Sequence, residues 1–146
     1  MLLEKGADVN QGGEYRCALQ AACFEGYDQI AQKLLSHGAN VNAKYGWHGT
    51  ALQAACTRGH DPILQKLLSQ GADVNAQGCF GNSLQAACAA GHDNIVQRLL
   101  SQGANVNAQG GDYGAAFRAA YFQGYEGIMQ ILLSRGAEVE ANGAEL

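Results

Sequence analysis

Three cysteines stand at matching places along the chain, where thiols could bind a metal ion or carry out redox chemistry. Cys23 and Cys56 each close the phrase ALQAAC, and Cys88 closes SLQAAC. If these phrases form stacked helices about 8–10 Å apart, the thiols lie too far apart for a disulfide, which needs Cα atoms within about 7 Å. Small buried thiols that fill the space between helices are therefore the favoured interpretation. Cys17 and Cys79 fall in loop phases, and we expect both to be exposed.

The histidines and hydroxyl groups do not form a recognisable catalytic set. His60 and His92 each follow a glycine, at the place where Tyr27 and Tyr125 stand in other copies of the same phrase. Tyrosine at an equivalent place indicates packing or hydrogen bonding rather than metal binding. The sequence has no Ser/His/Asp set, no metal-binding cluster and no G-x-x-x-x-G-K phosphate loop. We therefore expect no catalytic residues, no metal and no cofactor, and the chain is not predicted to be an enzyme.

Composition limits the classes of partner and the compartment. The 146 residues are enough for one ordinary domain. Nine basic and 13 acidic residues give a net charge of −4, whereas a nucleic-acid binder usually carries a basic excess. The apolar runs are far shorter than the roughly 20 residues that cross a membrane, and no basic, apolar leader opens the chain. The cysteine count is odd and lacks C-x-x-C spacing, which favours reduced thiols in the cytoplasm.

The cysteine phrase belongs to a repeat that runs through the whole chain. Gly-Ala-x-Val occurs five times, and the steps between copies are 32, 33, 32 and 33 residues. The copies begin at Gly6, Gly38, Gly71, Gly103 and Gly136. The phrase at Ala18–Cys23, Ala51–Cys56, Ser83–Cys88 and Ala116–Tyr121 recurs in phase, and so does a Leu-Leu pair. A period of this length is the signature of a solenoid, in which each unit contacts only its neighbours.

Each unit predicts two short helices, each followed by a glycine. The alanine-rich phrase favours a first helix of about two turns. Asp28, Asp61 and Asp93 are expected to be N-caps of a second helix, whose apolar face carries Ile30 and the Leu34-Leu35 pair. The glycines that end the helices are Gly26, Gly59, Gly91 and Gly124 after the first, and Gly38, Gly71, Gly103 and Gly136 after the second. The segments rich in Asn, Gly and Gln that follow are predicted loops or hairpins.

Helices of two turns are marginal in isolation, so successive pairs are expected to stack. Stacking is expected to bury the leucine of each first-helix phrase, Leu19, Leu52 and Leu84, together with Phe117 in the last copy. The Leu-Leu pairs behind them are expected to be buried as well. Lys33, Lys66 and Arg98 precede the Leu-Leu pair, and Ile131 stands at that place in the last copy. Because Ile131 interrupts a basic ridge, we expect the basic stems to cover the core while their charges lie in water.

A period near 33, helix–Gly–helix units and the wording Gly-Ala-Asp-Val-Asn resemble ankyrin repeats. The resemblance covers nearly the whole chain, and VNAQGG followed by ALQAA is similar to ankyrin arrays of fungal multidomain signalling proteins. It implies an all-α ankyrin-repeat solenoid of helix-turn-helix units with hairpin loops. We expect one domain, with a partial repeat at 1–9, full repeats at 10–41, 42–74, 75–106 and 107–139, and a partial repeat at 140–146. The usual Thr-Pro-Leu-His becomes Thr50–Gln53 here, and extra hairpin glycines leave the hairpin conformation open.

The resemblance also assigns a structural role to a recurring polar position. Gln20, Gln53 and Gln85 form a column in which Arg118 is the fourth member. In ankyrin repeats a polar side chain at this position hydrogen-bonds the backbone between adjacent hairpins. We therefore expect these glutamines to support the stack rather than to contact a ligand.

Two sets of positions differ between copies while the rest of the repeat stays fixed. One set follows the first-helix phrase, where the third copy has Ala89-Ala90, and the other lies in the hairpins. In the ankyrin family these sets line the concave face and the loop tips, and aromatic and Arg side chains dominate binding hot spots. The predicted partner-binding residues are Tyr15, Phe24, Glu25, Tyr45, Trp47, Thr57, Arg58, Phe80, Asp112, Tyr113, Phe122 and Gln123.

One hairpin column allows a second interpretation. Tyr15, His48, Phe80 and Tyr113 each stand three residues before the first-helix phrase. Such regular placement is equally consistent with hairpins that stack on one another through these side chains. Trp47 and Tyr45 fall outside this register, which favours a role in binding for both.

The predicted function is to bind another protein through the concave face and the loop tips, as part of a longer intracellular protein. The alternative is a scaffold that self-associates through its repeat ends, because no dedicated N-terminal cap is visible and terminal repeats normally present a polar face. A mass measured in solution separates the two.

Overall fold

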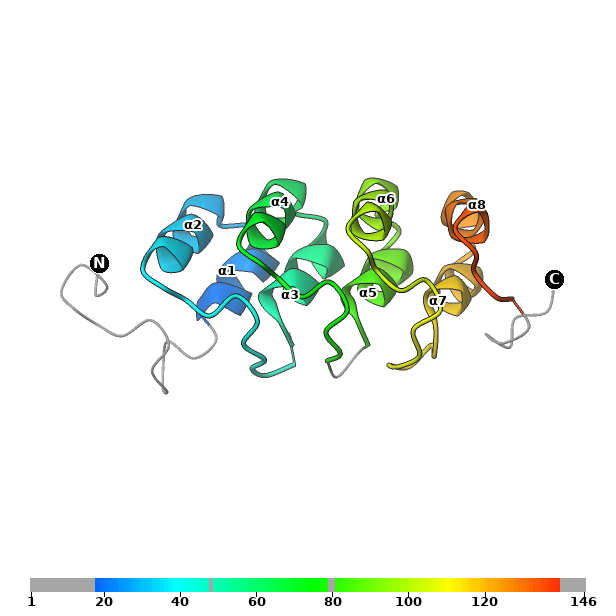
Figure 1. Ribbon diagram of the computed structural model, residues 1–146, viewed down its shortest axis with the longest axis horizontal. Helices are drawn as coiled ribbons and strands as arrows, with labels where there is room; N and C mark the ends of the chain where they lie inside the picture. Colours follow the sequence, from blue (N-terminus) through cyan, green and yellow to red (C-terminus); the bar gives the residue numbers. More distant parts are fainter. Residues whose placement is uncertain (1–17, 48, 79–80, 140–146) are drawn as a thin grey trace.

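The computed structural model describes residues 18–47, 49–78 and 81–139, which form four pairs of helices in a row (Figure 1). The first helices of the pairs are α1 (Ala18–Glu25), α3 (Ala51–Arg58), α5 (Ser83–Ala90) and α7 (Ala116–Gln123). The second helices are α2 (Asp28–Ser36), α4 (Asp61–Ser69), α6 (Asp93–Ser101) and α8 (Glu126–Ser134). The first helices form one layer and the second helices the other. This arrangement is the predicted all-α solenoid.

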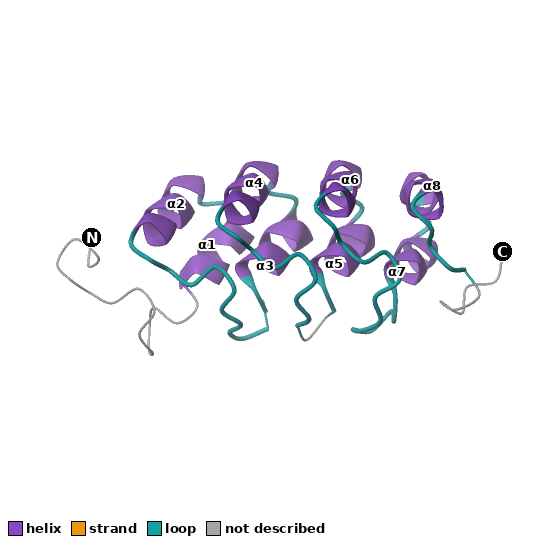
Figure 2. Cartoon of the chain, in the orientation of Figure 1, coloured by secondary structure: helices purple, strands orange, loops and turns teal. Residues whose placement is uncertain are grey.

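Outside the helices, the described residues form loops and turns without a strand (Figure 2). Three loops close into hairpins through single antiparallel bridges, Tyr45 to Gly49, Gly78 to Gly81 and Gly110 to Gly114. The bridged residues are four, three and four positions apart, in the same order as the 33-, 32- and 33-residue steps that contain them. The one-residue difference in repeat length therefore lies at the hairpin tips, and the helices keep their lengths.

The apolar core lies between the two layers, as predicted. In the first helices, Leu52, Leu84 and Phe117 are at most 1% exposed, and Leu19 is 5% exposed. In the second helices the first residue of each Leu-Leu pair is buried in the same way, at Leu34, Leu67, Leu99 and Leu132. The expectation that both leucines of every pair are buried is wrong, because Leu133 is 38% exposed. Because each layer supplies one side of this core, neither helix of a pair is stable without the other and without the next pair.

The glycine after each first helix is needed for two reasons. Its φ lies between 75° and 83° in all four described copies, a left-handed conformation that other residues rarely adopt. In the first three copies a ring from the next repeat also packs against this glycine, so that a Cβ on Gly26 would collide with His60, and one on Gly91 with Tyr125. His60 Nε2 also donates to the Phe24 carbonyl at 3.0 Å. The alternation of histidine and tyrosine at this place thus reflects the packing of a flat ring, as expected.

The N-cap role predicted for Asp28, Asp61 and Asp93 is wrong. Each aspartate is the first residue of its helix, and the N-cap position before it is held by a tyrosine or histidine whose side chain makes no cap. The sequence placed the start of the second helix one residue too late. A carboxylate in the first turn still interacts favourably with the positive end of the helix dipole.

Two of these carboxylates pair with a cation of the next repeat. Lys66 Nζ lies within hydrogen-bond distance of Asp28 Oδ1 at 2.6 Å, and Arg98 Nε lies 2.9 Å from Asp61 Oδ1. The expectation that the charges of Lys66 and Arg98 lie only in water is therefore wrong, because the stack brings residues 37 or 38 positions apart together. Ile131 stands at the equivalent place in the fourth pair, so it cannot continue this series.

The expectation of a buried Ile30 is also wrong. Ile30 is 46% exposed, whereas Ile63, Ile95 and Ile128 are at most 2% exposed. Helix α8, like α2, has only one described neighbour in its layer, yet it buries Ile128. The isoleucine therefore faces the preceding repeat, and α2 is the first second-layer helix that the structure describes.

Several sequence predictions fall outside the described residues. They are the partial repeats at 1–9 and 140–146 and the side chains of Tyr15, Cys17, His48, Cys79 and Phe80. Within the described ranges, the helices are too short and too polar for any of them to cross a membrane.

Candidate functional site

A column of glutamine side chains joins each first helix to the hairpin of the next repeat. In α3, Gln53 Nε2 donates to the carbonyls of Ala76, at 2.8 Å, and Gly81, at 3.0 Å. Gln20 and Gln85 make the corresponding bonds one repeat earlier and later. Buried polar groups are stable only with such partners, so the predicted structural role is confirmed for all three glutamines. The column fixes the position of each hairpin relative to the first helix of the preceding repeat.

A second column, made of asparagines, was missed by the sequence analysis. Asn42, Asn75 and Asn107 follow the valine of Gly-Ala-x-Val. Each Nδ2 donates at 3.1 Å to the carbonyl of the glycine one repeat later, at Gly71, Gly103 and Gly136. Each Oδ1 accepts a backbone N–H two residues beyond that glycine. The fixed recurrence of asparagine was a usable signal, because its side chain can donate and accept at once.

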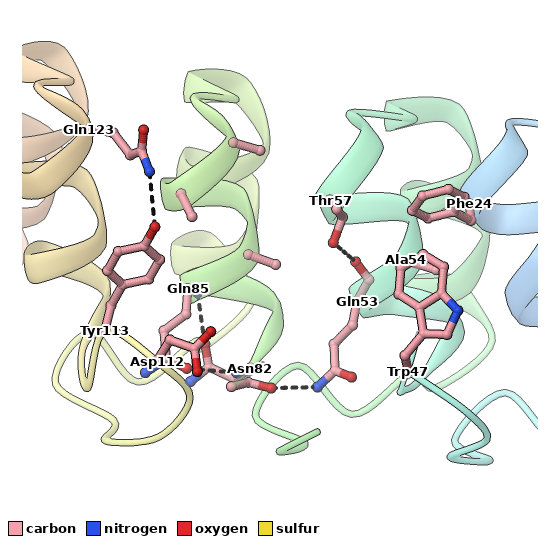
Figure 3. Close-up of a pocket in the computed structure, with 14 residues that line it drawn as sticks. Phe24, Trp47, Gln53, Ala54, Thr57, Asn82, Gln85, Asp112, Tyr113 and Gln123 are labelled. Atoms are coloured by element: carbon pink, nitrogen blue, oxygen red, sulfur yellow. Dashed lines mark hydrogen bonds between the residues drawn. The ribbon is translucent and has the colours of Figure 1, made fainter. Parts of the chain in front are cut away.

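Between these supports, the first helices and hairpins line a groove with a volume of about 390 Å³ (Figure 3). Its floor is made of small side chains, chiefly Ala54, Ala86, Ala89 and Ala90. The groove forms because α5 ends in Ala89-Ala90, where α1 and α7 carry Phe24 and Phe122. Large side chains therefore stand on α1 and α7, and α5, which lies between them in the row of helices, carries none at this place.

One wall of the groove is an aromatic pair from the first two described repeats. The rings of Phe24 and Trp47 meet edge to face, with centroids 5.1 Å apart. The guanidinium of Arg58 lies over the Phe24 ring, 4.8 Å from its centroid. Trp47 remains 57% exposed although it has this neighbour. The wall thus holds its shape while most of the indole surface still faces solvent.

The opposite wall comes from the fourth described repeat. Gln123 Nε2 donates to the Tyr113 hydroxyl at 3.0 Å, and the Tyr113 and Phe122 ring centroids are 6.3 Å apart. Asp112 lies beside Tyr113 on the hairpin and also lines the groove. The described contacts of Tyr113 are with its own repeat, so they do not support hairpin-on-hairpin stacking at this member of the column.

The fourth member of the glutamine column behaves differently. Arg118 stands where Gln20, Gln53 and Gln85 stand in the earlier copies. Its Nε is buried and has no hydrogen-bond partner in the described part of the chain. Its guanidinium lies over the Phe122 ring, 5.3 Å from the centroid. In the earlier copies the acceptor lies 23 residues after the glutamine. The equivalent position for Arg118 lies beyond residue 139, outside the described residues, so the structure does not test the predicted role of Arg118.

Sequence comparison now identifies this architecture. A model of ankyrin repeats in three copies matches residues 1–78 and again 52–143. The chain belongs to the ankyrin repeat family. A comparison with curated proteins gives no match.

In this ankyrin array, half of the predicted partner-binding residues line the groove. They are Phe24, Trp47, Thr57, Asp112, Tyr113 and Gln123. Arg58 and Phe122 contact lining aromatic rings, as described above, and Glu25 is an exposed neighbour of Phe24. Tyr45 forms the bridge that closes its hairpin. Tyr15 and Phe80 lie outside the described residues, so the structure does not place them.

The three repeated thiols of the ankyrin array are buried between the helices. Cys23, Cys56 and Cys88 are fully buried and not in disulfides. Burial raises the pKa of the Cys23 thiol from 9.0 to about 12, and burial likewise raises the pKa of Cys56 and Cys88 well above the ordinary value. A protonated, enclosed thiol is a poor nucleophile and a poor metal ligand. Within the described ranges, no three His, Cys, Asp or Glu side chains gather in a way that could hold a metal ion.

Proposed function

We propose that this ankyrin array binds a partner protein through the face formed by its first helices and hairpins. The observation that carries this proposal is the apolar groove between the Phe24–Trp47 wall and the Tyr113 wall. Ankyrin repeats are generally protein–protein interaction modules, and exposed apolar surface of this kind marks interaction sites. The proposal includes the predicted residues of both walls, and it assigns the chain no catalytic role.

Trp47 supplies the most direct support. A large aromatic side chain that stays 57% exposed leaves much of the free energy of its burial unused. The Phe24 ring and the Arg58 guanidinium hold this wall in place before any partner arrives. A preorganised aromatic anchor loses little side-chain entropy on binding, which is why such residues form hot spots.

The experiment is affinity capture of the partner from a lysate, followed by titration of that partner with purified variants. Trp47→Ala and Arg58→Ala should each weaken binding by at least about 1 kcal/mol. Because Trp47 is 57% exposed, the free energy of unfolding should change by no more than about 1 kcal/mol. If Trp47→Ala lowers the melting temperature by many degrees and leaves binding intact, its role is structural and the groove is not the binding face.

Tyr27→Ala is a matched control for this experiment. Tyr27 is 56% exposed, close to the value for Trp47, but it lies at the start of α2 and not in the groove. The proposal requires that Tyr27→Ala bind the captured partner with unchanged affinity.

The alternative, a scaffold that self-associates through its ends, is favoured by one observation. Tyr27 and Ile30 are exposed at the first described pair, whereas the equivalent side chains of later pairs pack against the preceding repeat. On this alternative, the mass in solution rises with concentration and Ile30→Glu returns it to that of one chain. Analytical ultracentrifugation of the two proteins decides the question.

We also propose that the array is one part of a longer intracellular protein. Reduced, buried thiols support a location inside the cell, in the cytoplasm. The likeness of its repeat wording to ankyrin arrays of fungal multidomain signalling proteins supports a role in recognition within such a protein. Expression of a tagged chain in cells, followed by microscopy, tests the compartment.

A further inference from the structure

The groove is apolar over most of its lining but ends at a single formal charge. Among the described residues that line it, Asp112 is the only one that carries a full charge at neutral pH. The Gln53 and Gln85 amide N–H groups and the Thr57 hydroxyl are already used on backbone carbonyls. Asp112 is exposed and makes no hydrogen bond or ion pair with any described residue. An acceptor of full negative charge therefore remains available at one end of an apolar floor.

The two walls differ in charge, which gives the groove a direction. Each wall has an arginine over a phenylalanine ring, Arg58 over Phe24 and Arg118 over Phe122, and neither arginine lines the groove. Asp112 comes just before Tyr113 on the hairpin, and both line the groove at the same wall (Figure 3). The Asp112 carboxylate is therefore the charge that distinguishes the two walls. A cation is therefore best accommodated beside Tyr113 and Asp112, where a carboxylate and the face of an aromatic ring both attract it.

We propose, building on the proposed function, that the groove accepts an arginine or lysine side chain from an extended segment of the partner protein. The methylene stem lies on the alanine floor of α5, and the charged head reaches Asp112 and Tyr113. The alanines at positions 86, 89 and 90 leave the space that such a stem needs. The Trp47 indole covers the segment from the opposite wall.

Other occupants fit the lining less well. A purely aliphatic or aromatic side chain would suit the floor, but the partner would then take Asp112 out of water without giving it a donor. An acidic segment would place like charges together. A basic side chain satisfies the floor and the carboxylate at once, because its stem is apolar and its head is charged.

The test uses peptides selected from a random display library on the purified protein. The proposal requires that the selected peptides share an arginine or lysine and that Trp47→Ala reduce their binding. Binding to the parent protein and to the aspartate variants is followed by the fluorescence of Trp47, the only tryptophan of the chain. Binding to Trp47→Ala, which lacks this signal, is followed by isothermal titration calorimetry, with the parent protein measured in the same way. Replacing the shared arginine by citrulline, which has the same shape without the charge, should weaken binding about tenfold, as expected for a close charge pair. Where the shared residue is lysine, norleucine replaces it.

A double-mutant cycle then assigns the charge to one residue. Against Asp112→Asn, the citrulline and arginine peptides should bind within about twofold of each other, because the coupled charge is gone. Asp93→Asn is the matched control: Asp93 is an exposed aspartate on α6, outside the groove, and there the tenfold difference should persist.

The outcomes separate this inference from the proposed function. Peptides that need Trp47 but share no basic residue, or a citrulline effect that survives Asp112→Asn, overturn the basic-side-chain inference and leave the groove as a binding site. Selected peptides that are all insensitive to Trp47→Ala, or a library that yields no binder, overturn both.

Discussion

The two sides of the first helices follow opposite rules. On the side that faces the second helices, the copies agree, and Leu52, Leu84 and Phe117 are each at most 1% exposed. On the side that faces the groove, the copies differ, with Phe24 in one repeat and Ala89 in another. A packed interior accepts few side-chain volumes at a given position, whereas a face in contact with solvent accepts many. Positions where the copies agree therefore form the frame, meaning the buried residues that hold the stack together. Positions where the copies differ form the surface that is available to bind a partner.

The largest effect should come from the frame. Leu84→Ala leaves a cavity in the interior of the stack and should lower the free energy of unfolding by about 2–5 kcal/mol. Ala89→Ser, on the groove side of the same helix, should change it by less than about 0.5 kcal/mol. Chemical denaturation of both variants measures the difference. Equal effects would remove the distinction between the two sides.

The next effect should come from the glutamine column. Gln85→Ala leaves the Ala108 and Gly114 carbonyls and the Asn82 N–H without their partner, and should cost about 1–3 kcal/mol. Arg118→Ala should cost less, because Arg118 holds no hairpin carbonyl among the described residues. Thermal unfolding compares the two. A larger loss for Arg118→Ala would show that the column does not depend on its carbonyl partners.

The buried thiols predict how stability depends on alkaline pH. The pKa of Cys23 is raised from 9.0 to about 12, so above pH 9 the thiol ionises first in the unfolded chain, and the stability it contributes is lost as pH rises toward 12. Each thiol should then lower the free energy of unfolding by roughly 1.4 kcal/mol per pH unit.

Denaturation at pH 8, 9 and 10 measures this slope, and Cys56→Ala should make it shallower than in the parent protein. The same burial predicts that Cys23, Cys56 and Cys88 react slowly with a thiol reagent until the protein is denatured, and we expect Cys79 to react quickly. Fast reaction of all five cysteines in the native protein would contradict the buried column.

The smallest effect should come from the ion pairs between second helices. The side chains of Arg98 and Asp61 are 37% and 35% exposed, and solvent weakens a pair of this kind. Arg98→Ile copies the residue that stands at this place in the fourth pair and should cost no more than about 1 kcal/mol. A loss of about 3 kcal/mol or more is the scale expected for a broken buried pair. It would show that this ion pair stabilises the protein as a buried pair does and not as a surface pair.

Most features that repeat along the chain were predicted from the sequence, although the asparagine column was missed. Ion pairs between side chains of neighbouring repeats were not predicted. The helix pairs and the left-handed glycines were predicted from the recurring phrases of the repeat. The bonds of Gln53 were predicted from the resemblance to ankyrin repeats. The hairpin glycines now have a reason as well, because a Cβ at Gly81 would collide with Gln85. The pairing of Asp61 with Arg98 was missed because it joins residues 37 positions apart.

The candidate site was predicted only in part for the same reason. Phe24, Trp47 and Tyr113 stand out because they are aromatic in variable positions. The floor does not stand out, since Ala89 and Ala90 matter only when larger side chains stand on either side of them. The groove is a space left by small side chains, so no single residue of the sequence indicates it. It is found only when the repeats are placed next to one another in the structure.

The hairpin tips show where this protein tolerates a change of length. The tip between Gly78 and Gly81 is one residue shorter than the two others, yet the helices on either side keep eight and nine residues. An insertion at a tip therefore adds reach without disturbing the register of the stack. Loop grafting can exploit this: a foreign recognition loop placed between Gly110 and Gly114 would be carried by a scaffold that already accepts two lengths at that place.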